Sequence, residues 1–206
     1  YLEMLDLTTK KLDTTISNIN HLLNFEKEIN QKDKEDCNLA ETIGRVIDLN
    51  NQIIKKHNVK VSVNVPGKIT VSAIPAHLDS IFHNLLTNAI KYGTTKTSKN
   101  IIIEAHLHND TVTVSVKDFG LGIDLDRFRD KLFQLGSRLH VASAEGQGLG
   151  LYMTKNQIEG LGGQIELDSE VGKGTTFRVT LPINAADLAT SNPAPTPSTT
   201  PNERAD

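Results

Sequence analysis

The residues with the clearest chemical potential are the amides of one mainly apolar segment, His83-Asn84-Leu85-Leu86-Thr87-Asn88-Ala89-Ile90-Lys91-Tyr92. Asn84 and Asn88 are four positions apart and Asn88 and Lys91 are three apart, so a helix brings them to one face. Magnesium prefers hard oxygen ligands, and one amide oxygen with phosphate oxygens would serve. Because asparagine is unfavourable inside a helix, two of them indicate a binding site rather than ordinary solvated amides.

Two glycine-rich segments follow in the chain. The first, Asp118-Phe119-Gly120-Leu121-Gly122, ends a predicted strand, and its glycines let the backbone turn sharply beside a ligand. Its carboxylate, when ionised, only accepts hydrogen bonds. The second, Gly146-Gln147-Gly148-Leu149-Gly150-Leu151, precedes a predicted helix, where exposed backbone amides favour phosphate. Each glycine segment alone also occurs in plain turns. The asparagine-bearing helix followed by the two glycine segments, in this order, predicts a nucleotide site.

The combination resembles the N, G1 and G2 boxes of the sensor histidine kinases, whose ATP-binding domain has the Bergerat, or GHKL-type, fold. The resemblance runs from about residue 39 to residue 182, and more loosely back to residue 1. It implies ATP and Mg²⁺ as ligands, with Asn88 as the metal ligand and Asn84 supporting the metal and phosphate region. It also implies that Lys91 offers a cation to the phosphates and that Tyr92 lies against the nucleotide.

The glycine segments take their roles from the same resemblance. Asp118 would recognise the exocyclic amino group of adenine, and Gly120 and Gly122 would form the turn beside the nucleotide. The second segment would contribute the nucleotide-binding loop residues Gly146, Gly148, Leu149 and Gly150.

The stretch between the glycine segments, about residues 124–145, matches the mobile ATP lid of that family. Phe128 and Phe133 correspond to its phenylalanine-bearing box, although Gln134 stands where a glutamate is frequent. Arg138 corresponds to an arginine that contacts phosphate in many members, so we include it among the expected catalytic residues.

Other polar residues near these motifs are interpreted as structural. Gly172, Gly174 and Thr175 resemble a further glycine element that supports the last strand rather than contacting the nucleotide. His77 and His83 are expected to be partly exposed residues of the helix that carries the asparagines.

Hydrophobic periodicity and turn residues predict the elements that position these motifs. Helices are expected over residues 39–57, 75–92 and 149–161, with one or two helical turns over 128–133. Strands are expected over residues 59–65, 69–71, 101–107, 112–116, 164–170 and 175–181. Because strands come singly and in hairpins, the predicted fold class is α+β, a two-layer α/β sandwich with a mixed, mostly antiparallel sheet and helices on one face.

The chain divides into four segments by pattern. Residues 1–31 read as a long helix with a bundle or coiled-coil seam at Leu5, Leu12, Ile16, Ile19 and Leu23. A generic coiled-coil stalk and the second helix of a histidine kinase dimerisation bundle fit this spacing equally, and the adjoining domain favours the bundle. Residues 32–38 read as a linker, 39–182 as the ATP-binding domain, and 183–206, rich in Pro, Ser and Thr, as a flexible tail.

Composition excludes several functional classes. The 206 residues carry a formal net charge of only −3, which gives no broad electrostatic case for nucleic acid or an anionic membrane. The single cysteine, Cys37, cannot form an intrachain disulfide and fits a cytoplasmic location. No apolar run approaches the roughly 20 residues needed to cross a bilayer, so we expect a soluble piece of a longer protein, without membrane contact of its own.

These features predict the catalytic part of a two-component sensor histidine kinase, transferring the γ-phosphoryl group of ATP to a histidine for relay to a response regulator receiver domain. His21 lacks the neighbouring acidic residue of the family's acceptor, so the acceptor helix is expected upstream, outside this chain. A homodimer is expected through residues 1–31 and that missing helix.

Three alternatives differ in chemistry. A GHKL-fold ATPase would place a water-activating glutamate four residues before the magnesium asparagine, where this chain has Asn84. A protein-serine kinase of the same fold is disfavoured by the bundle-like helix over residues 1–31. A nucleotide-binding signalling module without catalysis is disfavoured because the glycine motifs are intact.

Overall fold

The structure, a computed structural model, describes residues 9, 34–94, 98–136 and 149–183. The elements in chain order are β1 (Glu35–Asn38), α2 (Leu39–Leu49), α3 (Asn51–His57), β2 (Lys60–Asn64), β3 (Thr70–Ala73), α4 (Pro75–Tyr92), β4 (Asn100–His108), β5 (Thr111–Asp118), α5 (Leu125–Phe128), η1 (Arg129–Lys131), α6 (Gly150–Gly160), β6 (Gln164–Glu170) and β7 (Gly174–Pro182). The lid residue Arg138 lies outside the described residues, as do the predicted helix over 1–31 except for Thr9 and the predicted tail over 183–206 except for Ile183.

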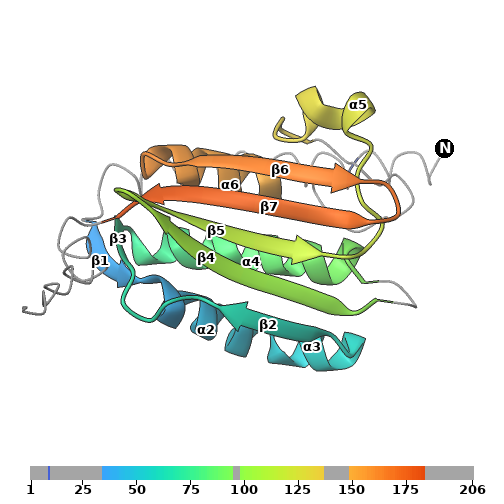
Figure 1. The fold of residues 1–206 in the computed structure, drawn as a ribbon. Coiled ribbons are helices and arrows are strands. Elements are labelled where there is room, and N and C mark those ends of the chain that lie inside the picture. The colour runs from blue at the N-terminus through green and yellow to red at the C-terminus, as the bar shows by residue number, and fades with distance from the viewer. Residues whose placement is uncertain (1–8, 10–33, 95–97, 137–148, 184–206) are drawn as a thin grey trace, which may run out of the picture.

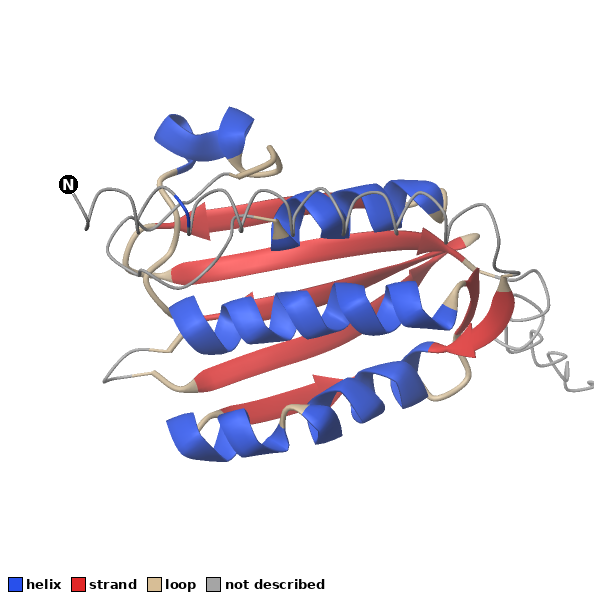
Figure 2. Cartoon of the chain, turned by 180° about the vertical axis from the view of Figure 1, so that it is seen from behind, coloured by secondary structure: helices blue, strands red, loops and turns tan. Residues whose placement is uncertain are grey.

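The main sheet has five strands in the order β2-β4-β5-β7-β6 (Figure 1). β2 pairs in parallel with β4, and the other neighbours pair antiparallel. Figure 2 shows that α2, α3, α4 and α6 all lie on one face of this sheet. The predicted α+β class, with a mixed, mostly antiparallel sheet and helices on one face, is therefore confirmed.

The central helix α4 spans the residues that the sequence predicts. Pro75 is its first residue, where a missing backbone amide costs nothing and the fixed φ suits a helix. Its buried residues recur every three or four positions and face the sheet: His77, Leu78, Ile81, Phe82, Leu85, Leu86, Ala89 and Ile90. Burying one large apolar side chain of this kind contributes about 1.5–3 kcal/mol, so this face anchors the helix that carries the asparagines.

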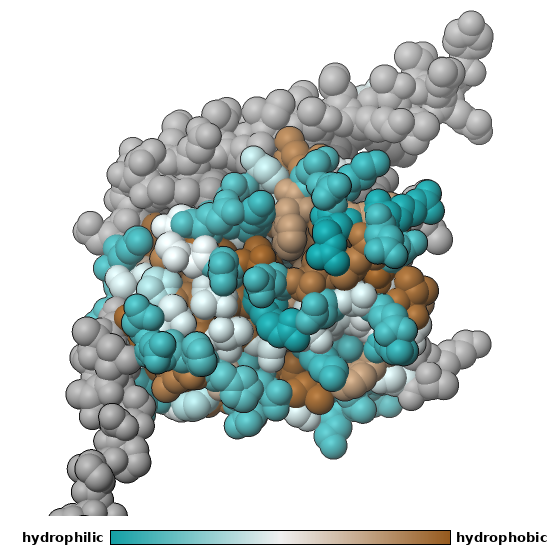
Figure 3. Space-filling view, turned by 45° about the horizontal axis from the view of Figure 1, so that its top comes forward, coloured by the Kyte–Doolittle hydropathy of each residue, from teal (hydrophilic) through white to brown (hydrophobic). Residues whose placement is uncertain are grey.

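The strands of the main sheet alternate between a buried and an open face. On β5, Val112, Val114 and Val116 are buried, and the register places Val114 opposite Val179 and Val116 opposite Phe177. The intervening Thr113, Ser115 and Lys117 are on the open face of the sheet. The space-filling view shows the molecule from an oblique angle, with hydrophilic and intermediate residues mixed with smaller hydrophobic patches (Figure 3). The sheet therefore buries one face only, as an antiparallel sheet allows.

The structure corrects the predicted boundary of the domain. The last four residues of the predicted linker, Glu35–Asn38, form β1, which pairs antiparallel with β3 in a separate two-stranded sheet. Asn38 then caps α2 by accepting a hydrogen bond from the backbone amide of Glu41 at 3.0 Å, and its Nδ2 donates to the Gly67 carbonyl at 2.7 Å. The folded domain thus begins before residue 39.

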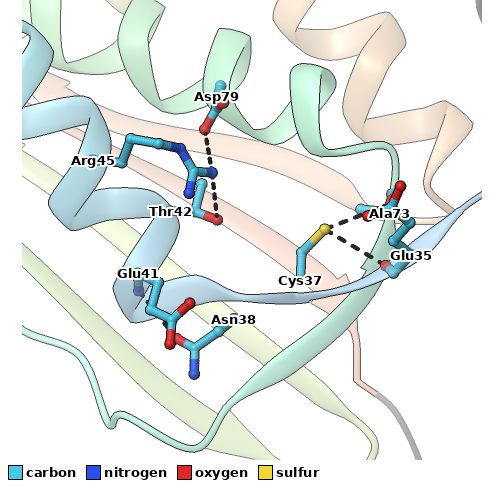
Figure 4. A network of polar contacts seen from close by, with 8 residues as sticks. All are labelled: Glu35, Cys37, Asn38, Glu41, Thr42, Arg45, Ala73 and Asp79. Carbon is cyan, nitrogen blue, oxygen red and sulfur yellow. Dashed lines mark hydrogen bonds and ion pairs between the residues drawn. The ribbon is translucent and has the colours of Figure 1, made fainter.

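A polar network surrounds this small sheet (Figure 4). Arg45 on α2 donates to Asp79 on α4 at 2.8 Å and lies 3.4 Å from the Thr42 hydroxyl. The Cys37 thiol is buried and donates to the Ala73 carbonyl at 3.6 Å, and burial raises the pKa of this thiol. These contacts join α2 to α4 and β1 to β3.

Two further expectations are corrected. The helix predicted over 39–57 is divided at Asn50, which is buried and donates from Nδ2 to the Val46 carbonyl at 2.8 Å. His77, expected to be partly exposed, is only 4% exposed, because its position on α4 faces the core. His83 is exposed, and its Nδ1 lies 3.0 Å from Nδ2 of Asn50.

The described helices include none with the length and apolar character that a bilayer crossing requires.

Candidate nucleotide site

The carboxylate of Asp118 lies at the end of β5, where the sheet gives way to the first glycine turn. Its Oδ1 accepts hydrogen bonds from the backbone amides of Gly120 at 2.9 Å and Thr175 at 3.2 Å. Both donors contact Oδ1, so Oδ2 is the oxygen of this carboxylate that can accept from a ligand. Burial raises the pKa of Asp118, and the two amide hydrogen bonds oppose that shift. The Asp118 carboxylate is therefore a hydrogen-bond acceptor that the backbone holds in a mostly buried position.

The glycine turn after Asp118 is joined to the end of α4 through the backbone. The Leu121 amide donates to the Tyr92 carbonyl at 3.1 Å. A Cβ on Gly120 would collide with that same carbonyl and with Gly93, and a Cβ on Gly93 would collide with the Asp118 side chain. The missing side chains are therefore what lets the turn, Asp118 and the end of α4 meet.

The β6–β7 turn closes the other side of the same loop. Gly122 has a positive φ of 65°, and a Cβ there would collide with the Glu170 carbonyl. The Gly172 amide donates to the Leu121 carbonyl at 2.8 Å, and a Cβ on Gly174 would collide with the Asp118 backbone. The interpretation of Gly172, Gly174 and Thr175 as structural agrees with these contacts, since Thr175 holds Asp118 through its backbone amide.

The amide pair on α4 is held by α6. Nδ2 of Asn84 donates to the Thr154 hydroxyl at 2.6 Å, and the Asn84 Oδ1 lies 3.5 Å from Nδ2 of Asn88. A Cβ on Gly150, the first residue of α6, would collide with the Asn84 side chain. The structure thus brings Gly150 of α6 against Asn84, which lies on the side of α4 that faces α6.

Lys91 and Tyr92 lie at the C-terminal end of α4, close to the turn that follows Asp118. Nζ of Lys91 is 5.3 Å from the centre of the Tyr92 ring, within the range of a cation–π contact. Lys91 is exposed and Tyr92 is half-buried. Both remain candidates for contact with a nucleotide.

The residues present fit a magnesium ion held mainly by a nucleotide. No cluster of three or more His, Cys, Asp or Glu suited to a metal occurs among the described residues. Asn88 uses Nδ2 for its contact with Asn84, which leaves its Oδ1, a hard oxygen ligand, for a cation. A site with one protein oxygen and several phosphate or water oxygens suits Mg²⁺.

Part of the predicted site cannot be placed. Gly146, Gly148 and Arg138 lie outside the described residues, so their predicted contacts stay predictions. Leu149 is 9% exposed and immediately precedes α6. Of the lid, the described part includes α5 and η1, and Nζ of Lys155 lies 5.8 Å from the centre of the Phe133 ring.

Sequence reasoning missed two residues of this site. Thr154 carries no motif that marks it, and only its position four residues after Gly150 could have suggested a contact with the same neighbour. Gly93 directly follows the asparagine helix, and its contact with Asp118 depends on long-range packing that sequence does not reveal.

Comparison with known proteins adds to this geometry. Residues 73–185 match the family described as histidine kinase-, DNA gyrase B- and HSP90-like ATPases. The chain belongs to this family. The matched region contains α4, Asp118 with its glycine turn, and α6, so it contains every described element of the candidate site.

Within this broad family, the similar proteins with known names include sensor kinases. Sporulation kinase E of Bacillus subtilis (strain 168) is 33% identical over 150 residues, covering 72% of this chain and 20% of the relative. The sensor protein kinase WalK of Staphylococcus haemolyticus (strain JCSC1435) is 27% identical over 195 residues, covering 89% of this chain and 31% of the relative. The structure of the mycobacterial sensor histidine kinase MprB has the same fold, with a TM-score of 0.63 and 22% identity, covering 73% of this chain and 97% of that one.

These findings identify the described part of the chain as a catalytic ATP-binding domain of the histidine kinase type. The chain corresponds to only 20% and 31% of the length of the two curated kinases.

Proposed function

We propose that this chain transfers the γ-phosphoryl group of ATP to a histidine on a separate helix of a sensor histidine kinase. In this reaction an unprotonated imidazole nitrogen attacks the γ-phosphorus, a P–N bond forms, and the bond from that phosphorus to the bridging oxygen of ADP breaks. Such a transfer requires positioning and charge neutralisation more than covalent help from the protein.

The chain's own residues divide this work. Oδ2 of Asp118 accepts from the amino group of adenine and fixes the base. Lys91 attracts the phosphates, and Tyr92 packs against the nucleotide. Asn88 would hold Mg²⁺ through Oδ1, and the ion would supply charge neutralisation at the phosphate oxygens. Asn84 supports Asn88, while Arg138 and the loop residues Gly146, Gly148, Leu149 and Gly150 contact the phosphates.

The observation that favours phosphoryl transfer to a histidine rather than hydrolysis of ATP is the chemistry of Asn84. A GHKL-fold ATPase needs a basic carboxylate four residues before the metal asparagine to activate water. Here the residue is an amide whose Nδ2 is already hydrogen-bonded to Thr154 at 2.6 Å. An amide has no useful basicity, so water at this position is not activated.

Partners follow from the same proposal. The acceptor histidine would lie on a separate helix, because His21 lacks the acidic neighbour of the family's acceptor and His83 of α4 already contacts Asn50. Residues 1–31 would form a homodimer, and the phosphoryl group would pass to a response regulator receiver domain. The reaction is expected in the cytoplasm.

Radiolabelled ATP tests the proposal. The chain is incubated with Mg²⁺ and with a separate polypeptide that carries a histidine kinase acceptor helix, and both label and phosphate release are measured. We expect acid-labile label on the acceptor, none without it, and little free phosphate. The Asn88→Ala variant should lose the label. Rapid phosphate release by the chain alone would support the ATPase alternative, and acid-stable label would support a serine kinase.

A further inference from the structure

The contact between α4 and α6 contains two pairs of polar side chains that lie about one turn apart. Ser80 accepts a hydrogen bond from Nε2 of Gln157 at 3.1 Å, and the Thr154 hydroxyl accepts one from Nδ2 of Asn84 at 2.6 Å. Thr154 is 1% exposed, so water cannot replace its hydroxyl without a rearrangement. The first pair joins two helices only, whereas the second contains a residue of the nucleotide site.

The direction of the second pair has a consequence for Asn88. An asparagine side chain presents two amide donors on one side and a carbonyl acceptor on the other. When Nδ2 of Asn84 is held by Thr154, Oδ1 of Asn84 faces Nδ2 of Asn88 at 3.5 Å. Without this hydrogen bond the Asn84 side chain would be free to leave its place beside α6, and its Nδ2 would then compete for Oδ1 of Asn88, the oxygen that fits a cation.

We propose that Thr154 is a positioning residue that anchors the Asn84 side chain beside Asn88 and so keeps Oδ1 of Asn88 directed to the metal–nucleotide complex. This inference rests on the proposed function, because it requires Asn88 to be the metal ligand. Gly150 completes the arrangement, since it leaves space for the Asn84 side chain on the same side of α6. Thr154 itself contacts neither nucleotide nor metal.

The two groups on Cβ of Thr154 allow a sharp test. Thr154→Val keeps the shape and removes the hydroxyl, whereas Thr154→Ser keeps the hydroxyl and removes a buried methyl group. Loss of a buried methyl destabilises a core, whereas loss of the acceptor leaves a donor of Asn84 unpaired. Both changes are therefore expected to lower stability, but only Thr154→Val removes the anchor of Asn84, so the positioning role predicts a loss of metal-dependent binding in Thr154→Val alone.

The readout is the metal enhancement of binding, defined as the ratio of the dissociation constants of a non-hydrolysable ATP analogue in excess EDTA and in Mg²⁺. Calorimetry on the full chain measures both constants, and thermal unfolding is recorded for each variant. We expect Thr154→Val to lower the enhancement by about fivefold and Thr154→Ser to change it by less than about twofold. Both variants should have a lower melting temperature than the wild type, because one leaves a donor of Asn84 unpaired and the other leaves a small cavity.

Ser80→Ala is the matched control, because it removes the other side-chain hydrogen bond between α4 and α6 without touching Asn84. We expect its metal enhancement to equal that of the wild type. In an Asn84→Ala background, Thr154→Val should have no further effect on the enhancement. Equal effects of Ser80→Ala and Thr154→Val, or an enhancement that follows the melting temperature, would overturn the positioning role.

The test also separates this inference from the proposed function. Asn88→Ala should abolish the enhancement if Asn88 is the metal ligand. If it does so while Thr154→Val behaves as the wild type, only the positioning role is wrong. If Asn88→Ala leaves the enhancement unchanged, both the proposed metal site and the inference fail.

Discussion

Thr175 near the start of β7 donates its backbone amide to Oδ1 of Asp118 at the end of β5, at 3.2 Å and across 57 positions of sequence. The Gly120 amide meets the same oxygen at 2.9 Å. One oxygen of the carboxylate is therefore committed to the fold, and the other is left for recognition. This division explains how a buried carboxylate can be both structurally fixed and available to a ligand.

The first prediction concerns that recognition. Asp118→Asn retains an acceptor for the two backbone amides but can present an amide donor to the amino group of adenine. Loss of one charge-assisted hydrogen bond is worth about 1.5–3 kcal/mol, so ATP affinity should fall roughly ten- to hundredfold. Calorimetry measures the change. Asp168→Asn, which removes an exposed carboxylate that pairs with Arg178 on the same sheet, is the control and should bind as the wild type.

The pH dependence of stability gives a second test of Asp118. Burial raises its pKa in the folded protein above the ordinary value of 3.8, so the folded state binds this proton more tightly than the unfolded state does. Its contribution to the free energy of unfolding is present below pH 3.8 and is lost as pH rises through the raised pKa. Denaturant unfolding without nucleotide should show the wild type losing stability relative to Asp118→Asn across this window. A difference between the two proteins that does not vary with pH would contradict the assignment.

The third prediction concerns the glycine turn. A Cβ at Gly120 would meet backbone atoms of Tyr92 and Gly93, which cannot move aside without displacing α4. Gly120→Ala should therefore lower the free energy of unfolding by about 2 kcal/mol and weaken ATP binding. Gly44 on α2 has no heavy atom within 4 Å of the same position, so Gly44→Ala should raise stability by about 0.5–1 kcal/mol. Equal effects of the two substitutions would show that the turn is not tightly packed.

Self-association is the fourth prediction, and it rests on sequence pattern alone because Thr9 is the one described residue of the predicted helix over 1–31. Charged residues at Leu12 and Ile19 would interrupt the predicted seam and raise the fraction of monomer in light scattering. Thr14→Glu lies off that seam and should leave the mass unchanged. A dimeric sample whose mass does not depend on Leu12 and Ile19 would reject the seam.

The sequence predicts the main sheet and α4 well because their signals are local. Alternating Val112, Val114 and Val116 fix a strand with one buried face, and Pro75 marks the first turn of α4. β1 was missed because Glu35, Asp36 and Asn38 are polar, and pairing with β3 rather than burial of its own face makes it a strand. Its pairing partner is more than 30 positions away, which no periodicity reveals.

The residues of the candidate site likewise fall into those that sequence reveals and those that only tertiary packing reveals. Asn84, Asn88 and Asp118 are recognisable from residue type and spacing, and the structure places Asn84 and Asn88 in contact. Thr154 and Gly93 are ordinary residues in sequence, and they matter only because tertiary packing brings them to Asn84 and Asp118. Whether His77 is exposed was likewise decided by packing, since a histidine on an apolar stripe of a helix faces the core.

The two-stranded sheet has a mechanical consequence. β1 is the first strand of the domain, and it pairs with β3, which is separated from α4 by Ile74 alone. A displacement of the chain before Glu35 would therefore act on β3 through four paired residues and, one residue later, on the start of α4, which bears Asn84, Asn88 and Lys91. The start of the folded domain is thus joined, through one strand pair, to the helix that carries the candidate site residues.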